Sequence, residues 1–335
     1  MKRRTLFAAA LAAGAAAIIG TAEAEEPLKL RIGWAQAPGH MAPLLYQNKA
    51  ILKHFGKSYV AEPTRFQGST PQIQAIASGE LEIAAFGAPA MVLAITNARQ
   101  DVRVVADVIQ DGVPGYYTAP FLVKKNGPVK TVQDLKGKRV ATNAIGSASD
   151  AALRIYLRRH GLQDRDFTSV EANFANMPAM IADGKVDMIS LQPQFAHGFI
   201  ETGEYIPLFT TKDAIGVSQI VFWAMRADVI AKNRPALVDF FEDHIRAMRW
   251  FLDPRNHAQA VDIAAAALKA PRETLDYAFT KADFYRSPDA RPMVDAVQRD
   301  VADAVELGVL KESLPIAPNY VDLSLIEEAK KRIDG

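Results

Sequence analysis

Residues 76–89 read IASGELEIAAFGAP, and residues 181–194 repeat this outline as IADGKVDMISLQPQ. Each stretch contains a helix end, a Gly, a short apolar strand with an acid, and a loop with a Pro. Upstream, residues 30–46 (LRIGWAQAPGHMAPLLY) and 138–156 (KRVATNAIGSASDAALRIY) share the order strand, small-residue loop, helix. The two echoes predict two similar α/β lobes. Ligands bind at the carboxyl ends of strands in such sheets, so a cleft between the lobes is expected; the fold does not by itself determine the chemistry of that cleft.

The segments around these echoes alternate between strand and helix patterns, from residue 28 to about 111 and again from 131 to 210. This alternation indicates mainly parallel sheets covered by helices. A helix is expected over residues 41–56 (MAPLLYQNKAILKHFG), ended by Gly56. Extended runs at 116–125 and 218–226 lie between the units. From residue 227 the pattern is almost wholly helical, with about five segments separated by Pro235, Pro254, Pro271, Pro288 and Pro315.

The chain is expected to cross between the lobes twice, near residue 113 and near residue 220. These crossings divide it into a first part of lobe 1 (25–113), lobe 2 (114–219) and a second, mostly helical part of lobe 1 (220–335). We therefore predict an α/β architecture with two lobes, two hinge strands and a helical C-terminal region on lobe 1. About 310 residues also exceed the size at which a single core keeps growing, roughly 250–300 residues.

Residues 1–24 have the pattern of a secretory signal peptide. Lys2, Arg3 and Arg4 precede an apolar run of 14 residues, and Ala22 and Ala24 are the small residues that direct cleavage. The run is short for a membrane span, which needs about 20 residues, so a retained anchor is the weaker alternative. We expect export to the periplasm with cleavage after Ala24. The Arg pair also permits the twin-arginine route.

Composition excludes several classes of site. The chain has no cysteine, hence no disulfide, thiolate metal site or lipid-bearing cysteine. Removing residues 1–24, with three basic residues and one acid, changes the formal net charge from +1 to −1. Such a balance is unlike a nucleic-acid-binding surface, so no nucleic-acid partner is expected.

Catalytic motifs are also absent from the sequence. The six histidines form no HExxH, and GxGxxG, the P-loop and GxSxG are missing. We therefore expect no catalytic residues, no metal site and no cofactor, and we do not expect the protein to be an enzyme.

Helix N-termini remain as candidate ligand-binding groups, because their unpaired N–H groups suit anionic oxygens. Ser147, Ala148 and Ser149 begin a helix, and Ser147 with Asp150 matches the S-x-x-D capping box. The box can simply start a helix; alternatively the two serines hold an anion. Asp150 either completes the cap or faces the cleft, where it would favour a ligand that also carries an amine.

Other loops at strand ends supply further candidates. Gly87 and Ala88 begin another helix, and Ser69 lies in the loop before a third. The loop after the first strand offers Gln36, Gly39, His40 and Met41, with His40 either binding a ligand oxygen or lying exposed. One of Tyr116 and Tyr117 is expected to form an apolar wall, although aromatic residues near strand ends usually belong to the core.

The chain resembles the periplasmic substrate-binding proteins of ABC importers, specifically the nitrate/sulfonate/taurine (NMT1-like) group, whose fold is shared with thiamine-pyrimidine-precursor binding proteins. The resemblance rests on the signal peptide and on GELEIAAFGAPA, DLKGKRVATNAIGSASDAALR, ADGKVDMISLQPQFA and FWAMRADVIAKNRPALVDFF, and it covers residues 28–330. It implies a type II periplasmic-binding-protein fold that closes on a small ligand, with the permease and ATPase of an ABC importer as partners. A monomer is expected.

The resemblance also places cleft residues on the loops named above and near the downstream Pro loop. There the chain has Gln192 and Gln194 flanking Pro193, where many relatives have an aromatic residue or an acid before the Pro. The candidate loops lack Lys and Arg, which favours organic sulfonates or carboxylates over a small inorganic anion. The alternative is a periplasmic enzyme or sensor-partner domain on the same fold.

Overall fold

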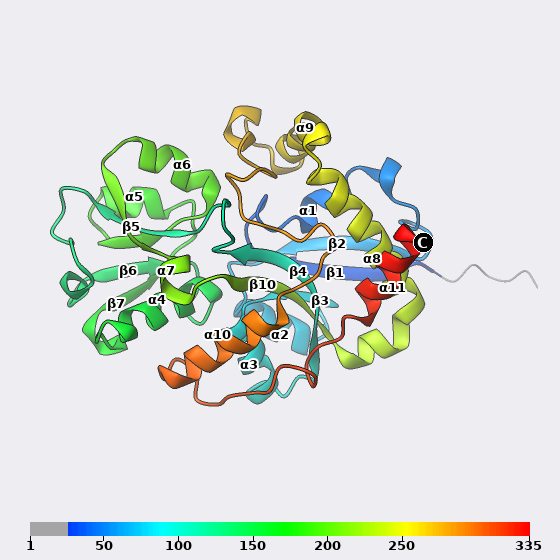
Figure 1. The fold of residues 1–335 in the computed structure, drawn as a ribbon, viewed down its shortest axis with the longest axis horizontal. Helices are drawn as coiled ribbons and strands as arrows, with labels where there is room; N and C mark the ends of the chain where they lie inside the picture. The colour runs from blue at the N-terminus through cyan, green and yellow to red at the C-terminus, as the bar shows by residue number, and fades with distance from the viewer. Residues whose placement is uncertain (1–25) are drawn as a thin grey trace, which may run out of the picture.

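A computed structural model describes residues 26–335, which form two five-stranded sheets with helices packed around each (Figure 1). The signal-peptide prediction and its cleavage point lie outside the described residues. We call the sheet with strand order β2-β1-β3-β10-β4, together with its helices, lobe 1, and the sheet with order β7-β6-β8-β5-β9, together with its helices, lobe 2.

Lobe 1 begins with the alternation that the sequence predicts. Its strands are β1 (Leu28–Trp34), β2 (Tyr59–Arg65), β3 (Ile83–Phe86), β4 (Val102–Asp111) and β10 (Ser218–Arg226). Its first helices are α1 (Ala42–Leu45), η1 (Lys49–Ile51), α2 (Pro71–Ala77) and α3 (Ala88–Thr96). Strand β1 pairs in parallel with β2 and β3, so the loops that follow these strands meet at one edge of the sheet.

Lobe 2 repeats this layout. Its strands are β5 (Pro120–Lys124), β6 (Arg139–Thr142), β7 (Thr168–Glu171), β8 (Met188–Ser190) and β9 (Tyr205–Thr210). Its helices are η2 (Val132–Leu135), α4 (Ala148–Arg159), η3 (Asp164–Asp166), α5 (Met177–Ala182), α6 (Pro193–Glu201) and α7 (Thr211–Ile215). In each sheet the strand that enters directly after a crossing, β5 or β10, runs antiparallel to its neighbours.

The two crossings run side by side. A Cβ on Gly112 would lie 2.7 Å from the carbonyl oxygen of Gly216, so the backbones approach too closely for a side chain. Both glycines also have positive φ, 76° and 72°, a conformation that glycine adopts without steric cost. The first crossing leaves β4 after Asp111, and the second enters β10 at Ser218.

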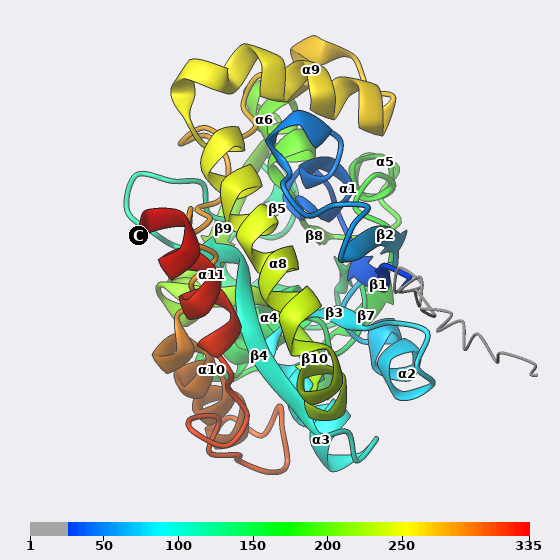
Figure 2. The same ribbon diagram turned by 90° about the vertical axis from the view of Figure 1, so that its right-hand side faces the viewer.

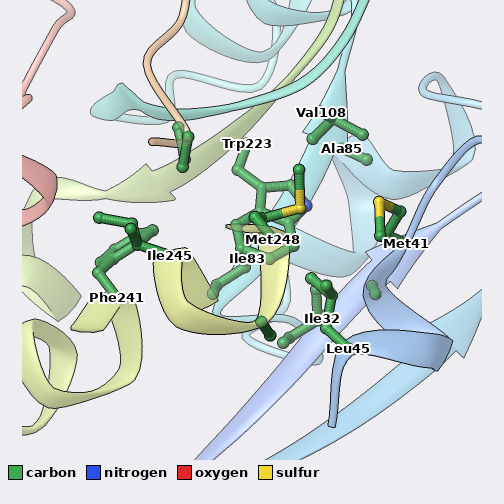
Figure 3. Close-up of a cluster of buried hydrophobic side chains, with 14 of the residues drawn as sticks. Ile32, Met41, Leu45, Ile83, Ala85, Val108, Trp223, Phe241, Ile245 and Met248 are labelled. Carbon is green, nitrogen blue, oxygen red and sulfur yellow. The ribbon is translucent and has the colours of Figure 1, made fainter. Parts of the chain in front are cut away.

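Helix α8 (Ala227–Phe251) covers lobe 1, and α11 (Ser324–Asp334) lies beside it (Figures 1 and 2). Figure 3 shows the core beneath α8, where Phe241, Ile245 and Met248 lie near Trp223 of β10. Full burial of such side chains contributes roughly 1.5–3 kcal/mol each.

The C-terminal region differs from prediction in two ways. Pro235 does not separate two helices: α8 continues through it, with a kink at Asn233. Residues 276–293, between η5 (Arg272–Leu275) and α10 (Val294–Glu306), are largely irregular rather than helical, and so are residues 307–323, between α10 and α11. The remaining elements are η4 (Pro254–Asn256) and α9 (His257–Leu268). Helix α10 also reaches lobe 2, because Arg159 pairs with Asp303 at 2.7 Å.

The helix predicted over residues 41–56 is wrong in extent, since it is broken into α1 and η1. The buried Asp243 of α8 explains why no helix continues through residues 53–55. Its carboxylate accepts hydrogen bonds from the backbone N–H groups of Lys53, His54 and Phe55 at 2.6, 2.8 and 3.1 Å. The chain leaves helical geometry because these donors bind an acceptor distant in sequence instead of helix carbonyls.

Among residues 26–335, no helix is both long and apolar enough to cross a membrane.

Candidate functional site

A cavity of about 60 Å³ lies between the lobes, where strand ends of both sheets meet. Lobe 1 contributes the loops after β1 and β2 and the end of β4; lobe 2 contributes the loop between β6 and α4 and the starts of α6 and α7. Seven of the predicted site residues line it: Gln36, His40, Ser69, Ser147, Ala148, Ser149 and Gln192.

The loop after β1 is held in place by a residue from the irregular C-terminal segment. Arg286 donates from Nε to the carbonyl oxygen of Gly39 at 2.9 Å, and its guanidinium pairs with Asp283 at 2.9 Å. Both charged side chains are almost fully buried, 1% and 0% exposed. This ion pair fixes the loop that carries Gln36 and His40 into the cavity.

His40 is buried, not exposed, and is neutral near pH 7. Burial, together with the nearby positive charge of Arg286, lowers its pKa from 6.5 to about 3. Its Nδ1 accepts the N–H of Ala35 at 3.4 Å, so Nε2 carries the proton in this tautomer and can donate to a ligand oxygen.

The start of α4 brings three polar side chains together. Ser147, the N-cap of α4, accepts the N–H of Asp150 at 3.4 Å. The hydroxyl groups of Ser147 and Ser149 both donate to Oδ1 of Asn143, at 3.0 and 2.5 Å. Asn143 therefore orients both serines toward the cavity that all three line.

Asp150 completes the helix start but does not line the cavity. Its carboxylate accepts from the N–H of Gly146 at 2.9 Å and from Nε of Arg154 at 2.8 Å. The two-way capping box is thus only half formed, because Asp150 bonds the N–H of residue 146 and not that of Ser147. Of the two alternatives for Asp150, the structure supports the capping role.

Hydrogen bonds join the two lobes around the cavity. Nε2 of Gln67 donates to the carbonyl oxygen of Asn143 at 2.7 Å, and Nδ2 of Asn143 donates to the carbonyl oxygen of Gln67 at 3.0 Å. Thr70 donates to the carbonyl oxygen of Ile145 at 2.9 Å. These contacts hold the start of α4 against lobe 1.

The structure does not bring the other predicted site residues into the cavity. Met41 belongs to the hydrophobic core, where Figure 3 shows it near Leu45 and Ile32. Gly39 contributes its backbone to the Arg286 contact. Gly87 packs against Ala148: a Cβ added to Gly87 would lie 2.7 Å from the Cβ of Ala148. Ala88 lines a smaller, separate depression.

The two predicted tyrosines and Gln194 also lie outside the cavity. Tyr116 stacks edge-on with Tyr285 in a separate surface depression. Tyr117 donates to the carbonyl oxygen of Leu191 at 3.1 Å and supports Phe284, which does line the cavity. Gln194 donates to the carbonyl oxygen of Ala37 at 3.3 Å and so joins the lobes.

Several residues that line the cavity were not predicted from the sequence. Asp111 is the last residue of a strand, and Asn143 directly follows one. Their positions at strand ends are the only features of the sequence that could have indicated a place in the cavity. Phe284 lies in a segment expected to be helical. The other residues that sequence analysis missed are Ala35, Gly68, Ile109, Ala119, Phe174, Thr211, Ile220 and Val221.

Within the described chain, one group of side chains has the spacing of metal ligands: His54, Asp239 and Glu242 in lobe 1. Glu242 already pairs with Lys53 at 3.3 Å and with Arg246 at 2.9 Å. These cations compensate the buried carboxylate, and none of the three residues lines the cavity. We assign the group to the packing of α8.

The amino-acid sequence is similar to one protein family and to a named bacterial protein. The model of the NMT1-like family matches residues 23–265. A protein of Escherichia coli (strain K12), named as an aliphatic sulfonates-binding protein, is 26% identical over 216 residues. That match spans 63% of this chain and 63% of the relative, less than two thirds of its length.

Solved structures show the same fold. The alkanesulfonate-binding protein from Xanthomonas axonopodis pv. citri bound to MOPS has a TM-score of 0.68 at 21% identity, over 88% of this chain and 98% of the other. A desulfurization enzyme has a TM-score of 0.62 at 15% identity, over 91% and 99%. The predicted two-lobed fold of periplasmic binding proteins is confirmed, and enzymes also use it.

Proposed function

Because the chain belongs to the NMT1-like family, we propose that it is an exported solute-binding protein that captures a small organic anion between its lobes. The ligand class is a sulfonate or carboxylate, and delivery is to the permease and ATPase of an ABC importer. The protein acts as a monomer, and no catalytic step, metal or cofactor is needed for capture.

The observation that carries this proposal is the group of donors at the start of α4. Ser147, Ser149 and the N-terminus of a 12-residue helix meet an inter-lobe cavity. Helix N-termini and hydroxyl groups stabilise anionic oxygens through dipoles and hydrogen bonds. Each serine hydroxyl, whose only proton goes to Oδ1 of Asn143 in this structure, would turn from Asn143 to the anion. Among the described residues that line the cavity none is Lys or Arg, so directed donors rather than full positive charges would hold the anion.

The cavity size supports a small ligand. About 60 Å³ is well below the roughly 300–1,000 Å³ typical of pockets for drug-sized molecules. In this proposal residues 25–113 and 220–335 move as one lobe and residues 114–219 as the other. Hinges near 113–117 and 216–221 let the ligand enter before the lobes close.

The relatives support the ligand class and the role in transport. The named activity of the E. coli relative is binding of aliphatic sulfonates, and the Xanthomonas protein binds MOPS, itself a sulfonate. Capture before import requires a protein outside the inner membrane, which agrees with the signal-peptide pattern of residues 1–24. N-terminal sequencing of the periplasmic form should therefore begin at Glu25.

Serine substitutions test the anion site. Calorimetry with ethanesulfonate and propionate should show that Ser147→Ala and Ser149→Ala each weaken binding by about 1.5–3 kcal/mol, the range for a hydrogen bond to a charged group. Ser78→Ala, which removes a hydroxyl remote from the cavity, is the matched control and should bind like the wild type.

The free energies of unfolding of the two serine variants distinguish a ligand-binding role from a helix-capping role. Ser147→Ala should lower the free energy of unfolding by about 1 kcal/mol through the lost cap. Ser149→Ala should cost about 0.5–1.5 kcal/mol, because its bond to Asn143 is lost. If both variants bind like the wild type while their unfolding transitions shift, the segment only begins a helix and the anion site lies elsewhere.

A periplasmic enzyme is the second candidate, favoured by the fold shared with the desulfurization enzyme. Mass spectrometry of the probes after prolonged incubation discriminates the two. Stoichiometric recovery of intact ligand supports capture, whereas a product that accumulates beyond one equivalent supports catalysis.

A further inference from the structure

Asp111, the last residue of β4, lines the cavity and is fully buried. One carboxylate oxygen, Oδ2, accepts the N–H of Ala119 at 3.1 Å. The other, Oδ1, is buried and has no hydrogen-bond partner within residues 26–335. A buried acceptor without a partner is costly, so such a group at a ligand cavity points to a partner that the ligand supplies.

The surroundings of Asp111 do not neutralise its charge. The described lining contains neither Lys nor Arg, and the low pKa of His40 leaves that ring neutral. Burial raises the pKa of Asp111 to about 6, while the nearby Thr118 hydroxyl and the N–H groups of Ala119 and Gly112 favour the charged form. Of these three groups, only the N–H of Ala119 has hydrogen-bond geometry to the carboxylate. No cationic side chain of the described cavity lining therefore pairs with Asp111.

Asp107, on the same strand, is a buried acid whose hydrogen bonds are all made within the protein, and it serves as the comparison for Asp111. It is also buried, but both its oxygens are bonded by the protein. Gln219 donates to Oδ1 and the N–H of Ser287 donates to Oδ2, each at 2.6 Å. Asp107 does not line the cavity. Asp150 and Asp300 also have a buried oxygen without a partner, but of the three acids only Asp111 lines the cavity.

The cavity consequently has two chemically different ends within a small volume. Donors at the start of α4 suit an anionic group, whereas Asp111 suits a hydrogen-bond donor. We propose that Asp111 determines specificity by selecting an anion that also carries a donor, above all an ammonium group, a few bonds from the anionic group. This inference rests on the proposed function and narrows its ligand class.

Three sulfonates of similar size test it by calorimetry on protein purified from the periplasmic fraction: 2-aminoethanesulfonate, 2-hydroxyethanesulfonate and propane-1-sulfonate. The wild type should bind the amino probe most tightly and the propyl probe least. We expect at least about a tenfold ratio between these two, equivalent to about 1.4 kcal/mol.

Two variants locate the effect. Asp111→Asn keeps the shape and an oxygen for the Ala119 N–H but removes the charge, so the ratio of amino to propyl affinity should fall to near one. Asp107→Asn removes a buried charge from the same strand and should leave this ratio unchanged. Thermal melts check that each variant folds, and the wild-type ratio is informative without any variant.

The outcomes separate the inference from the proposed function. If the wild type binds the propyl probe as tightly as the amino probe, or if Asp111→Asn keeps the preference, the inference is overturned and anion capture stands. If the wild type binds none of the sulfonates nor 3-aminopropanoate and butanoate, the proposed function itself is wrong and the inference falls with it.

Discussion

Gln67 of lobe 1 and Asn143 of lobe 2 join the lobes through two reciprocal hydrogen bonds, 2.7 and 3.0 Å long. The same Asn143 accepts from the hydroxyl groups of Ser147 and Ser149 with its side-chain oxygen. One residue therefore links lobe contact to the geometry of the candidate anion site. Any change that separates Gln67 from Asn143 should alter closure and ligand binding together.

Alanine at Gly68 or Gly87 should block this approach of the lobes. A Cβ on Gly68 would lie 2.6 Å from Nδ2 of Asn143, and one on Gly87 would lie 2.7 Å from Cβ of Ala148. We expect each variant to bind ligand at least about tenfold more weakly, a loss of about 1.4 kcal/mol. In X-ray scattering, the ligand should no longer reduce the radius of gyration.

Gly198→Ala is the control for these two variants. This position lies on α6, and a Cβ there would meet nothing within 4 Å. It should bind ligand normally and gain about 0.5–1 kcal/mol of stability from the helix preference of alanine. Unchanged affinity in Gly68→Ala and Gly87→Ala would show that this close approach of the lobes is not required for binding.

Replacing Arg286 with Met should destabilise the protein strongly. The substitution leaves Asp283 buried without its cation, and breaking a buried pair from one side typically costs about 3–5 kcal/mol. Urea unfolding measures the loss. Arg291→Met, which breaks an exposed pair with Glu327, should cost at most about 1 kcal/mol. Equal losses in the two variants would contradict the role given to Arg286.

Asp300 should make the stability of the protein depend on pH. This carboxyl lies in α10 beside Ala148 and Gln219, and burial raises its pKa from 3.8 to about 8. The folded protein thus holds the proton more tightly than the unfolded chain. The stability that this proton provides is present below about pH 4 and is lost as pH rises to about 8.

Asn at position 300 mimics the protonated acid. The melting temperature of Asp300→Asn should therefore be close to that of the wild type near pH 4 and higher than that of the wild type near pH 8. Asp295→Asn removes an exposed carboxylate from the same helix and is the matched control. Melting curves across this pH range decide the matter. A difference between Asp300→Asn and the wild type that does not grow with pH would contradict the assignment.

The sequence alone was sufficient for the fold class, the alternation of elements and seven of the 18 residues that line the cavity. Strand and helix patterns, and the cap at Ser147, depend on residues two to four positions apart, so they can be read directly from the text. The loops after β1, β2, β6 and β8 follow from that alternation, because loops at strand ends meet at one edge of a parallel sheet.

Tertiary structure decided which side chains enter the cavity and which do not. Met41 was expected to face a ligand, yet it packs in the core. The helix expected over residues 41–56 does not reach its end, because Asp243, 190 residues away, binds the N–H of Lys53. Asn143 likewise meets a partner 76 residues away. Asp111 lines the cavity beside residues of both lobes that are distant from it in sequence. Local patterns determine elements, whereas burial and the pairing of buried polar groups depend on contacts between distant segments, which no short stretch of sequence encodes.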